Sequence, residues 1–308
     1  MQEKNLAAID LGSNSCRIYI TDNEGKVLYR EAESVKLGEK LCQDKNLSDD
    51  AMKRGLACLY HYAELLKSFN VEHYRAIATA SCRMASNSEA FVKMVEELCN
   101  IKLDIISAYD EAYLNLCGAK LNADKQPYIL VYDLGGGSTE ITLATNEAKP
   151  KIIYTLSIPY GARNAAEAFD IIEYDEEKCQ RLHAEIKKYT QEFLTNSEFL
   201  IYKPKCCCLA TSSTPLRLFN MLEKTPVYDM NYADGLTKNT ADLSNLMENI
   251  WKMDFTQMKN SVYIGTNRAP IFVAACVIFK TIYEELQITK LTASLKSAQE
   301  AIIEELKR

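Results

Sequence analysis

The sequence predicts an α/β protein made of two similar halves, each with a mixed sheet of parallel and antiparallel strands. Two nearly repeated segments carry this prediction, AAIDLGSNS at 7–15 and ILVYDLGGGSTE at 129–140. Each copy has an apolar strand, an Asp-Leu-Gly turn with small polar residues, and a second apolar segment. Similar elements follow both copies, so the order βββαβαβα is predicted twice along the 308 residues.

The first half continues with a hairpin and a third strand, predicted from alternating segments at 16–21 and 26–35. A long helix follows, because Ser48 suits an N-cap and Asp49 and Asp50 complement the helix dipole. Its apolar residues recur at helical spacing: Met52, Leu56, Leu59, Ala63 and Leu66. The other elements predicted here are a strand at 75–80, a helix near 88–99, a strand at 101–106 and a helix at 110–120.

The second half repeats this order, with predicted strands at 127–134, 139–145 and 151–157. One helical stretch is predicted at 163–195, where apolar residues form one face: Cys179, Leu182, Ile186, Tyr189 and Phe193. The remaining predictions are a strand at 206–210, helices near 215–222, 240–253 and 268–287, a strand at 288–293 and a last helix to 307.

A polar, turn-like segment, LNADKQP at 121–127, is the predicted boundary between two domains. Domain I covers 1–121 and contains the first Asp-Leu-Gly turn, whereas domain II covers 122–308 and contains the second. The C-terminal helix at 296–308 is a candidate to pack back on domain I. At roughly 150 residues per domain, a chain of 308 residues suggests about two domains, each large enough for its own core.

Composition narrows the class of protein and its partners. The chain has 36 Lys+Arg and 42 Asp+Glu, a net charge of −6 that argues against non-specific binding to a nucleic acid polymer. No apolar run approaches the ~20 residues that span a bilayer, and the N-terminus lacks the pattern of a signal peptide. The eleven cysteines are scattered, without a CxxC pair. Reduced thiols in a cytoplasmic protein without a membrane partner are therefore predicted.

The two Asp-Leu-Gly turns are candidates for binding phosphate. Glycine is scarce, with 11 in the chain, yet four of these lie in the two turns: Gly12, Gly135, Gly136 and Gly137. Such turns present backbone N–H groups to an anion. Asp10 and Asp133 at the preceding strand ends are candidates to hold hydrated Mg²⁺. The second turn lacks the Gly-Lys-Ser/Thr that completes a P-loop.

A second set of candidate residues lies between the turns. Arg83 comes just after a predicted strand, where a guanidinium can grip phosphate oxygens, and Asp110 and Glu111 begin a helix. The alternative is that the two acids only complement the helix dipole and that Arg83 pairs at the surface. The three histidines, His61, His73 and His183, have no metal-ligand spacing, which argues against a zinc hydrolase or a Ser-His triad.

Four motifs together resemble the exopolyphosphatase/guanosine pentaphosphate phosphatase (Ppx/GppA) family: DLGSNSCRIYI at 10–20, ATASCRMASN at 78–87, ISAYDEAYL at 106–114 and DLGGGSTE at 133–140. They match in order, spacing and identity. The resemblance implies the duplicated actin-like (ribonuclease H-like) fold, with two domains whose mixed sheets flank a cleft, in its short two-domain form. It also implies Mg²⁺-dependent release of terminal orthophosphate from polyphosphate or from guanosine pentaphosphate. A homodimer is one assembly that the resemblance implies.

The resemblance also implies a role for each matching residue. Glu111 is expected to activate the attacking water, and Arg83 to bind the phosphate. Asp133 and Glu140 are expected to position the metal and the water, with Asp10 supporting the metal. The expected phosphate-binding turns are Gly12, Ser13, Asn14 and Ser15, and Gly135, Gly136, Gly137 and Ser138.

The second half departs from the family pattern in two glycine-rich loops. A GTSGT-like loop reads ATSST at 210–214, and a GLREG-like motif reads SLKSA at 294–298. Three alternatives therefore stay open beside an exopolyphosphatase: a guanosine pentaphosphate phosphatase, a polyanion sensor without turnover, and an acetate- or sugar-type kinase. The other basic candidates for binding a polyanion are Lys36, Arg163, Arg217 and Arg268.

Overall fold

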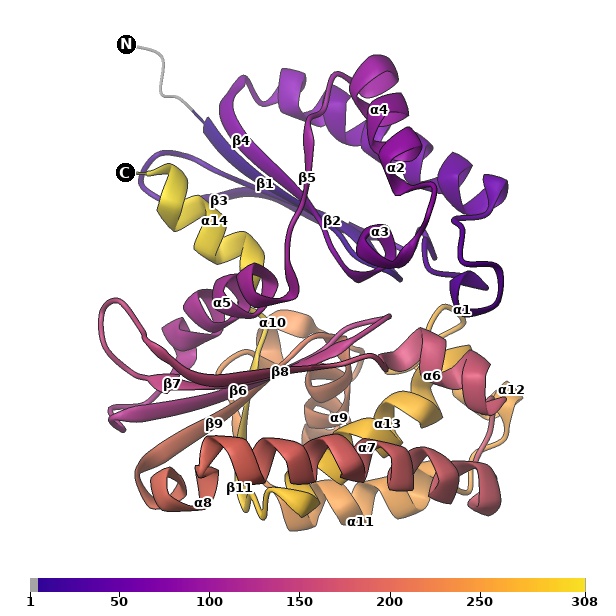
Figure 1. Cartoon of the computed structure of the whole chain (residues 1–308), viewed down its shortest axis with the longest axis vertical. Coiled ribbons are helices and arrows are strands. Elements are labelled where there is room, and N and C mark those ends of the chain that lie inside the picture. The colour runs from indigo at the N-terminus through magenta and orange to yellow at the C-terminus, as the bar shows by residue number, and fades with distance from the viewer. Residues whose placement is uncertain (1–4, 308) are drawn as a thin grey trace. The chain divides into compact units, whose positions relative to one another are not determined.

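The computed structural model describes residues 5–307 (Figure 1). These residues form two compact units. The first unit contains the chain before Asn115 together with the chain from Ala298 onward, and the second unit is Asn115–Ser297. The predicted boundary segment 121–127 falls inside the second unit, where it overlaps the end of the short 3₁₀ turn Lys120–Asn122.

The first unit is built on a five-stranded sheet in the order β3-β2-β1-β4-β5. Strands β1, β2 and β3 are antiparallel neighbours, whereas β4 runs parallel to β1 and β5 parallel to β4. The strands are β1 Asn5–Leu11, β2 Cys16–Thr21, β3 Val27–Glu33, β4 Val71–Ala78 and β5 Leu103–Ile105. The helices are α1 Leu41–Asp44, α2 Asp49–Ser68, α3 Ala80–Met84, α4 Ser88–Cys99, the start of α5 (Ala108–Ala119) and α14 Ala298–Leu306.

The second unit has a six-stranded sheet in the order β10-β11-β9-β6-β7-β8. The strands are β6 Tyr128–Leu134, β7 Thr139–Thr145, β8 Ile152–Ile158, β9 Cys206–Thr211, β10 Thr237–Asn239 and β11 Lys290–Ser294. The helices are the end of α5, α6 Ala162–Phe169, α7 Glu176–Ser197, α8 Phe199–Tyr202, α9 Ser213–Glu223, α10 Met230–Ala233, α11 Thr240–Ile250, α12 Phe255–Asn260 and α13 Ala269–Glu285.

The predicted duplication is confirmed by the strand order. The order β8-β7-β6-β9-β11 repeats β3-β2-β1-β4-β5, with the same parallel and antiparallel neighbours, and β10 is an addition at one edge. The fold is therefore the duplicated α/β architecture with mixed sheets that the sequence and the family resemblance predict.

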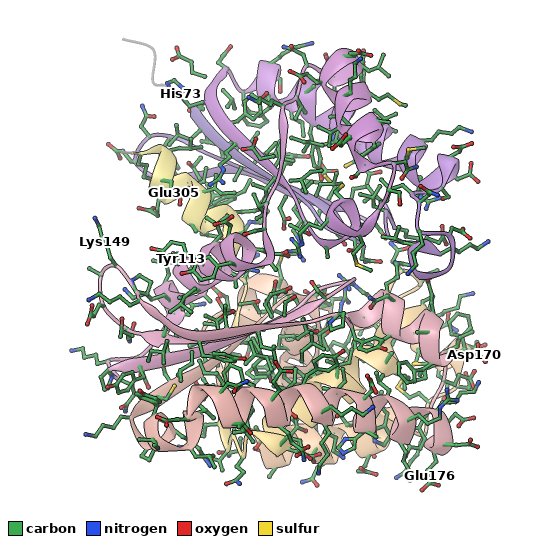
Figure 2. The ribbon with its side chains drawn as sticks, in the orientation of Figure 1. His73, Tyr113, Lys149, Asp170, Glu176 and Glu305 are labelled. Atoms are coloured by element: carbon green, nitrogen blue, oxygen red, sulfur yellow. The ribbon has the colours of Figure 1, made fainter. Side chains whose placement is uncertain are left out.

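The helical stretch predicted at 163–195 is wrong as a single element. The chain leaves α6 at Asp170, which adopts the left-handed conformation with φ 53°, and α7 begins after its N-cap Asp175. Figure 2 labels Asp170 and Glu176 on the two sides of this break. The short helices α1, α3, α8, α10 and α12 and the strand β10 were also not predicted.

Each sheet buries apolar residues on both faces. In the first unit, α2 and α4 cover one face, and α14 packs on β1, β2 and β4. In the second unit, Leu116 and Ala119 of α5 pack on Ile129 and Val131, whereas α6, α7, α9 and α13 cover the opposite face. No helix within residues 5–307 has an apolar stretch long enough to cross a lipid bilayer.

Candidate active site

The two Asp-Leu-Gly turns are closed by the same backbone hydrogen bond. In the first turn the Gly12 N–H donates to the Ser15 carbonyl at 3.0 Å, and in the second the Gly135 N–H donates to the Ser138 carbonyl at 3.0 Å. Each turn joins an antiparallel pair of strands, β1 to β2 and β6 to β7. The repeat in the sequence therefore corresponds to the same hydrogen-bonded turn between two antiparallel strands.

The first turn is held by the segment that follows β3. The Ser13 carbonyl accepts from the Gly38 N–H at 2.8 Å, and the Asn14 carbonyl accepts from the Lys36 N–H at 3.0 Å. A Cβ at Gly38 would lie 2.6 Å from Ser81 Oγ and 3.2 Å from Ser13 Cβ, so glycine permits this close approach. Lys36 itself has φ 49° and contributes its backbone to the turn.

The second turn is held by the start of α6. The Ala162 N–H donates to the Gly135 carbonyl at 2.9 Å and the Arg163 N–H to the Gly136 carbonyl at 2.8 Å. Asn164 Nδ2 donates to the Gly137 carbonyl at 2.8 Å. Since the carbonyl side of the turn faces α6, an anion would meet its N–H side, which is the side that suits phosphate.

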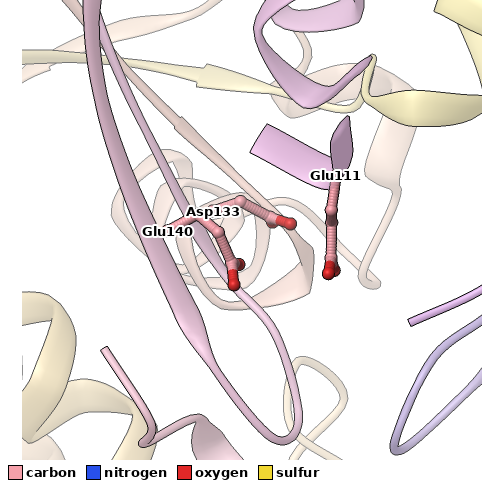
Figure 3. A group of neighbouring side chains, drawn as sticks. All are labelled: Glu111, Asp133 and Glu140. Carbon is pink, nitrogen blue, oxygen red and sulfur yellow. The ribbon is translucent and has the colours of Figure 1, made fainter. Parts of the chain in front are cut away.

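Asp133 and Glu140 are directly opposite each other on β6 and β7. Figure 3 shows their carboxyl groups together beside the second turn. Thr211 Oγ1 donates to Asp133 Oδ1 at 2.6 Å, and Ser157 Oγ donates to Glu140 Oε1 at 3.0 Å. Two carboxylates held in this way are the hard oxygen donors that Mg²⁺ prefers.

Asp10, the counterpart of Asp133 in the first half, has a different neighbour across the strands. It lies opposite Arg17 on β2, and Arg17 Nη1 is 3.6 Å from Asp10 Oδ2. Where the second half pairs two acids, the first half pairs an acid with a base. The second turn therefore offers two neighbouring carboxylates to a cation, whereas the first offers one carboxylate beside a guanidinium.

Arg83 and Glu111 form an ion pair within the first unit. Arg83 lies in α3 and Glu111 in the first turn of α5, and Arg83 Nη1 donates to Glu111 Oε2 at 2.6 Å and to the Ile106 carbonyl at 3.1 Å. Glu111 is buried, with 8% of its surface exposed. The neighbouring acid Asp110 is exposed, and it exchanges hydrogen bonds with Ser107: the Asp110 N–H donates to Ser107 Oγ, and Ser107 Oγ donates to Asp110 Oδ2. Asp110 therefore suits the role that the alternative interpretation gave to both acids, which is to complement the helix dipole.

Helix α5 carries Glu111 and, one helical turn later, Asn115, which contacts Asp133. Asn115 follows Glu111 by four residues, which places both side chains on one face of α5. Asn115 Nδ2 donates to Asp133 Oδ2 at 2.7 Å.

The chain matches the Ppx/GppA phosphatase family over residues 18–307. It belongs to this family. A bifunctional 3-dehydroquinate synthase/phosphatase of Fusobacterium nucleatum is 31% identical in an alignment of 298 residues that covers 90% of this chain. The same match covers 43% of that relative, so this chain spans less than half of the relative's length.

Solved structures of similar proteins agree with the fold of this Ppx/GppA family member. An exopolyphosphatase-like protein superposes with a TM-score of 0.87 at 19% identity, over 99% of both chains. An exopolyphosphatase from Cytophaga hutchinsonii gives 0.87 at 21% identity, over 99% of this chain and 98% of that one. A Ppx/GppA family member from Aquifex aeolicus gives 0.80 at 22% identity, over 98% and 97%.

Of the other basic candidates in the second unit, Arg163 and Arg217 have partners of their own. Arg163 is buried, and its Nη1 lies 3.8 Å from Glu167 Oε1. Arg217 Nη1 donates to the carbonyls of Tyr263 and Ile264, and its guanidinium lies 4.0 Å from the centre of the Tyr228 ring. Burial lowers the pKa of Arg217. Arg217 therefore stabilises the loop before α13.

Sequence reasoning missed three side chains of this Ppx/GppA site: Asn115, Ser157 and Thr211. Asn115 had a usable signal, because it lies one helical turn after Glu111. Thr211 and Ser157 had none, because they reach Asp133 and Glu140 through the pairing of β9 with β6 and of β8 with β7. These contacts depend on which residues the strand register places opposite each other, and the names of Thr211 and Ser157 alone do not reveal that register.

Proposed function

We propose that this Ppx/GppA protein is a Mg²⁺-dependent phosphohydrolase that releases terminal orthophosphate from inorganic polyphosphate. The observation that carries the proposal is the pair of buried or half-buried carboxylates, Asp133 and Glu140, beside a turn whose N–H side suits phosphate. The Arg83–Glu111 pair supplies a cation for phosphate and a carboxylate for water.

The donor set fits a hard divalent cation. Asp133 and Glu140 are the candidate ligands, and both offer carboxylate oxygens. When bound there, Mg²⁺ would neutralise charge on the phosphoryl oxygens. Thr211 and Ser157 orient the acids by donating to Asp133 and Glu140.

The chain's own groups would carry the rest of the reaction. The turns at 12–15 and 135–138 bind phosphate oxygens through backbone N–H groups. Arg83 uses Nη1 for Ile106 and Glu111, and a guanidinium has five N–H donors, so others remain to bind phosphate. Glu111 accepts the proton of the attacking water. Phosphoryl transfer requires mainly such positioning and charge neutralisation.

The test is orthophosphate release from long-chain polyphosphate by the purified protein with Mg²⁺, compared with Glu111→Gln. Removing a general base should lower the rate by about 10²–10⁴-fold. Asp110→Asn is the matched control, because Asp110 is the adjacent acid and its carboxylate accepts a hydrogen bond from Ser107. Release by Glu111→Gln at the parental rate would refute the role of Glu111, and no release by the parental protein would refute the function.

Guanosine pentaphosphate is the second candidate substrate, since the matching family includes phosphatases of both kinds by its name. A panel of long polyphosphate, short polyphosphate and guanosine pentaphosphate at equal phosphate separates the two. We expect faster release from polyphosphate. Faster release from guanosine pentaphosphate would reverse the order of the candidates, and tight binding of either without release would indicate a sensor.

A further inference from the structure

Asn115 occupies a position in α5 that no sequence motif assigns to the reaction. Its side chain is buried, with 5% exposed, and its Nδ2 donates to Asp133 Oδ2 at 2.7 Å. An ionised carboxylate only accepts hydrogen bonds, so the amide of Asn115 must present its nitrogen to Asp133. A hydrogen bond to a charged group is shorter and about twice as strong as one between neutral groups.

The other oxygen of Asp133 is held from a different element. Thr211 at the end of β9 donates through Oγ1 to Asp133 Oδ1 at 2.6 Å. With one donor on each oxygen, the plane of the carboxylate is fixed, and the directions left for a cation are fixed with it. Hydrogen-bond partners of this kind orient a ligating carboxylate and tune its affinity for a metal.

The backbone around Asn115 is itself tightly placed. Leu116 and Ala119, on the same stretch of α5, pack on the sheet of the second unit. A Cβ at Gly118 would lie 1.8 Å from the Ser297 carbonyl oxygen, so glycine is required for this approach. Asn115 therefore holds Asp133 from a rigid support, and Glu111 begins the preceding turn of the same helix.

We propose that Asn115 is a positioning residue of the phosphohydrolase: it orients Asp133 for the divalent cation and ties the helix that carries Glu111 to β6. This inference rests on the proposed function. Asn115 would not touch the substrate or the attacking water. Its effect would pass through the carboxylate of Asp133 and through α5.

The test measures Mn²⁺ binding to the folded protein by electron paramagnetic resonance, without substrate, and then phosphate release as Mn²⁺ is varied. Asn115→Leu keeps the size of the side chain and removes the donor. Loss of such a partner typically weakens metal affinity by about 10–100-fold, and the metal concentration for half-maximal rate should rise by the same factor. A purely structural role would lower the unfolding temperature and leave both quantities unchanged.

Asn122→Leu is the matched control. Asn122 also donates to a carboxylate, that of Asp234, and it lies in the same unit shortly after α5. Asp234 is not a candidate ligand, so Mn²⁺ affinity should stay at the parental value. Equal Mn²⁺ affinity of Asn115→Leu and the parent, with the parent active, would overturn this inference alone. A parent that neither binds Mn²⁺ nor releases phosphate would overturn the proposed function and this inference with it.

Thr211→Val provides a second route if Asn115→Leu fails to fold. It removes the donor to the other oxygen of Asp133 and keeps the shape of the side chain. Weaker Mn²⁺ binding is expected here too, and the double variant should lose less than the sum of the two, because both donors act on one carboxylate. Parental Mn²⁺ affinity in Thr211→Val, or strictly additive losses, would contradict a shared action on Asp133.

Discussion

One nitrogen of the Arg83 guanidinium makes two contacts. Its Nη1 is bound to the Ile106 carbonyl and to Glu111, which fixes the guanidinium beside the proposed base. The side chains of Arg83 and Glu111 are 20% and 11% exposed, so the pair is largely removed from water. Removing one partner of such a pair typically costs about 3–5 kcal/mol, because the other charge stays buried.

Arg83→Lys is therefore expected to lower kcat/KM for polyphosphate by about 10- to 100-fold, the loss of one hydrogen bond to a charged group. The ammonium of lysine keeps the charge, but it lacks the planar fork that can hold Glu111 and a phosphate together. Arg75→Lys is the control, since Arg75 lies on β4 and pairs with Asp104 and Glu305. Parental kinetics for Arg83→Lys would mean that Arg83 serves only as a point charge.

Single residues also show how far sequence reasoning reaches. Ser48 was predicted as an N-cap, and its Oγ accepts from the Ala51 N–H at 3.2 Å. Such contacts lie within one turn of the chain, so a local pattern identifies them. The contact of Thr211 with Asp133 joins residues that are far apart in sequence, and it exists only because β9 pairs with β6 in one register.

Helix α6 packs closely on the second turn at Gly161, the residue that precedes the helix. Gly161 has φ −121°, so glycine is not required by backbone conformation. It is required by space: a Cβ would lie 2.6 Å from the Gly136 carbonyl carbon and 2.7 Å from the Gly135 oxygen and the Gly137 nitrogen. All three contacts are backbone atoms of the second Asp-Leu-Gly turn.

Gly161→Ala should consequently displace this turn and impair phosphate binding more than it impairs stability. Overpacking of this kind typically costs about 1–3 kcal/mol of unfolding free energy. Inhibition by orthophosphate reports binding at the turn, and urea denaturation reports stability. Unchanged inhibition by orthophosphate would show that the turn can move aside without losing its N–H geometry.

The break between α6 and α7 explains why one predicted helix became two. Asp170 adopts the left-handed conformation, and both its N–H and the Ile171 N–H donate to the Ala166 carbonyl, so α6 ends there. Lys178 Nζ then donates to the Asp170 carbonyl at 2.9 Å and to Asp170 Oδ2 at 2.7 Å. Apolar spacing persists through this stretch, and for that reason the sequence pattern did not reveal the break.

The Asp170–Lys178 pair leads to a pH-dependent prediction. The hydrogen bond from Lys178 lowers the pKa of Asp170. A lowered pKa stabilises the fold above the pKa of the unfolded chain, and this contribution is lost as pH falls through the lowered value. Asp170→Asn, which tolerates the left-handed conformation, should unfold at a slightly lower temperature than the parent at pH 7. The difference should disappear in strong acid; a difference that persists there would implicate conformation instead of charge.

At the scale of the whole molecule, the last helix completes the first unit. Gln299 Nε2 donates to the Ala8 carbonyl at 3.1 Å, Glu300 pairs with Arg30, and Glu305 pairs with Arg75 at 2.9 Å. The buried apolar residues of α14 are Ala298, Ala301, Ile302 and Ile303. The fold of the first sheet therefore depends on the final residues of the chain.

Ile302→Ala tests whether the two units share their stability. Ile302 is fully buried in the first unit, and truncation of such a residue typically costs about 2–5 kcal/mol. We expect faster hydrogen exchange in β1 and β4 and an unchanged rate in β6. The reason is that α14 packs on β1, β2 and β4, which are strands of the first unit. Trp251, the single tryptophan, lies in the second unit and stacks on Tyr174, so its fluorescence follows that unit.

In Ile302→Ala, circular dichroism should accordingly detect unfolding at a lower urea concentration than Trp251 fluorescence does, because only the first unit has lost apolar contacts. Ile201→Ala is the control, since Ile201 is 73% exposed on α8 and a surface truncation usually changes stability by less than about 0.5 kcal/mol. Coincident transitions in Ile302→Ala, with β6 exchanging faster by the same factor as β1, would show that the units unfold together. The stability carried by α14 would then belong to the whole chain and not to the first sheet.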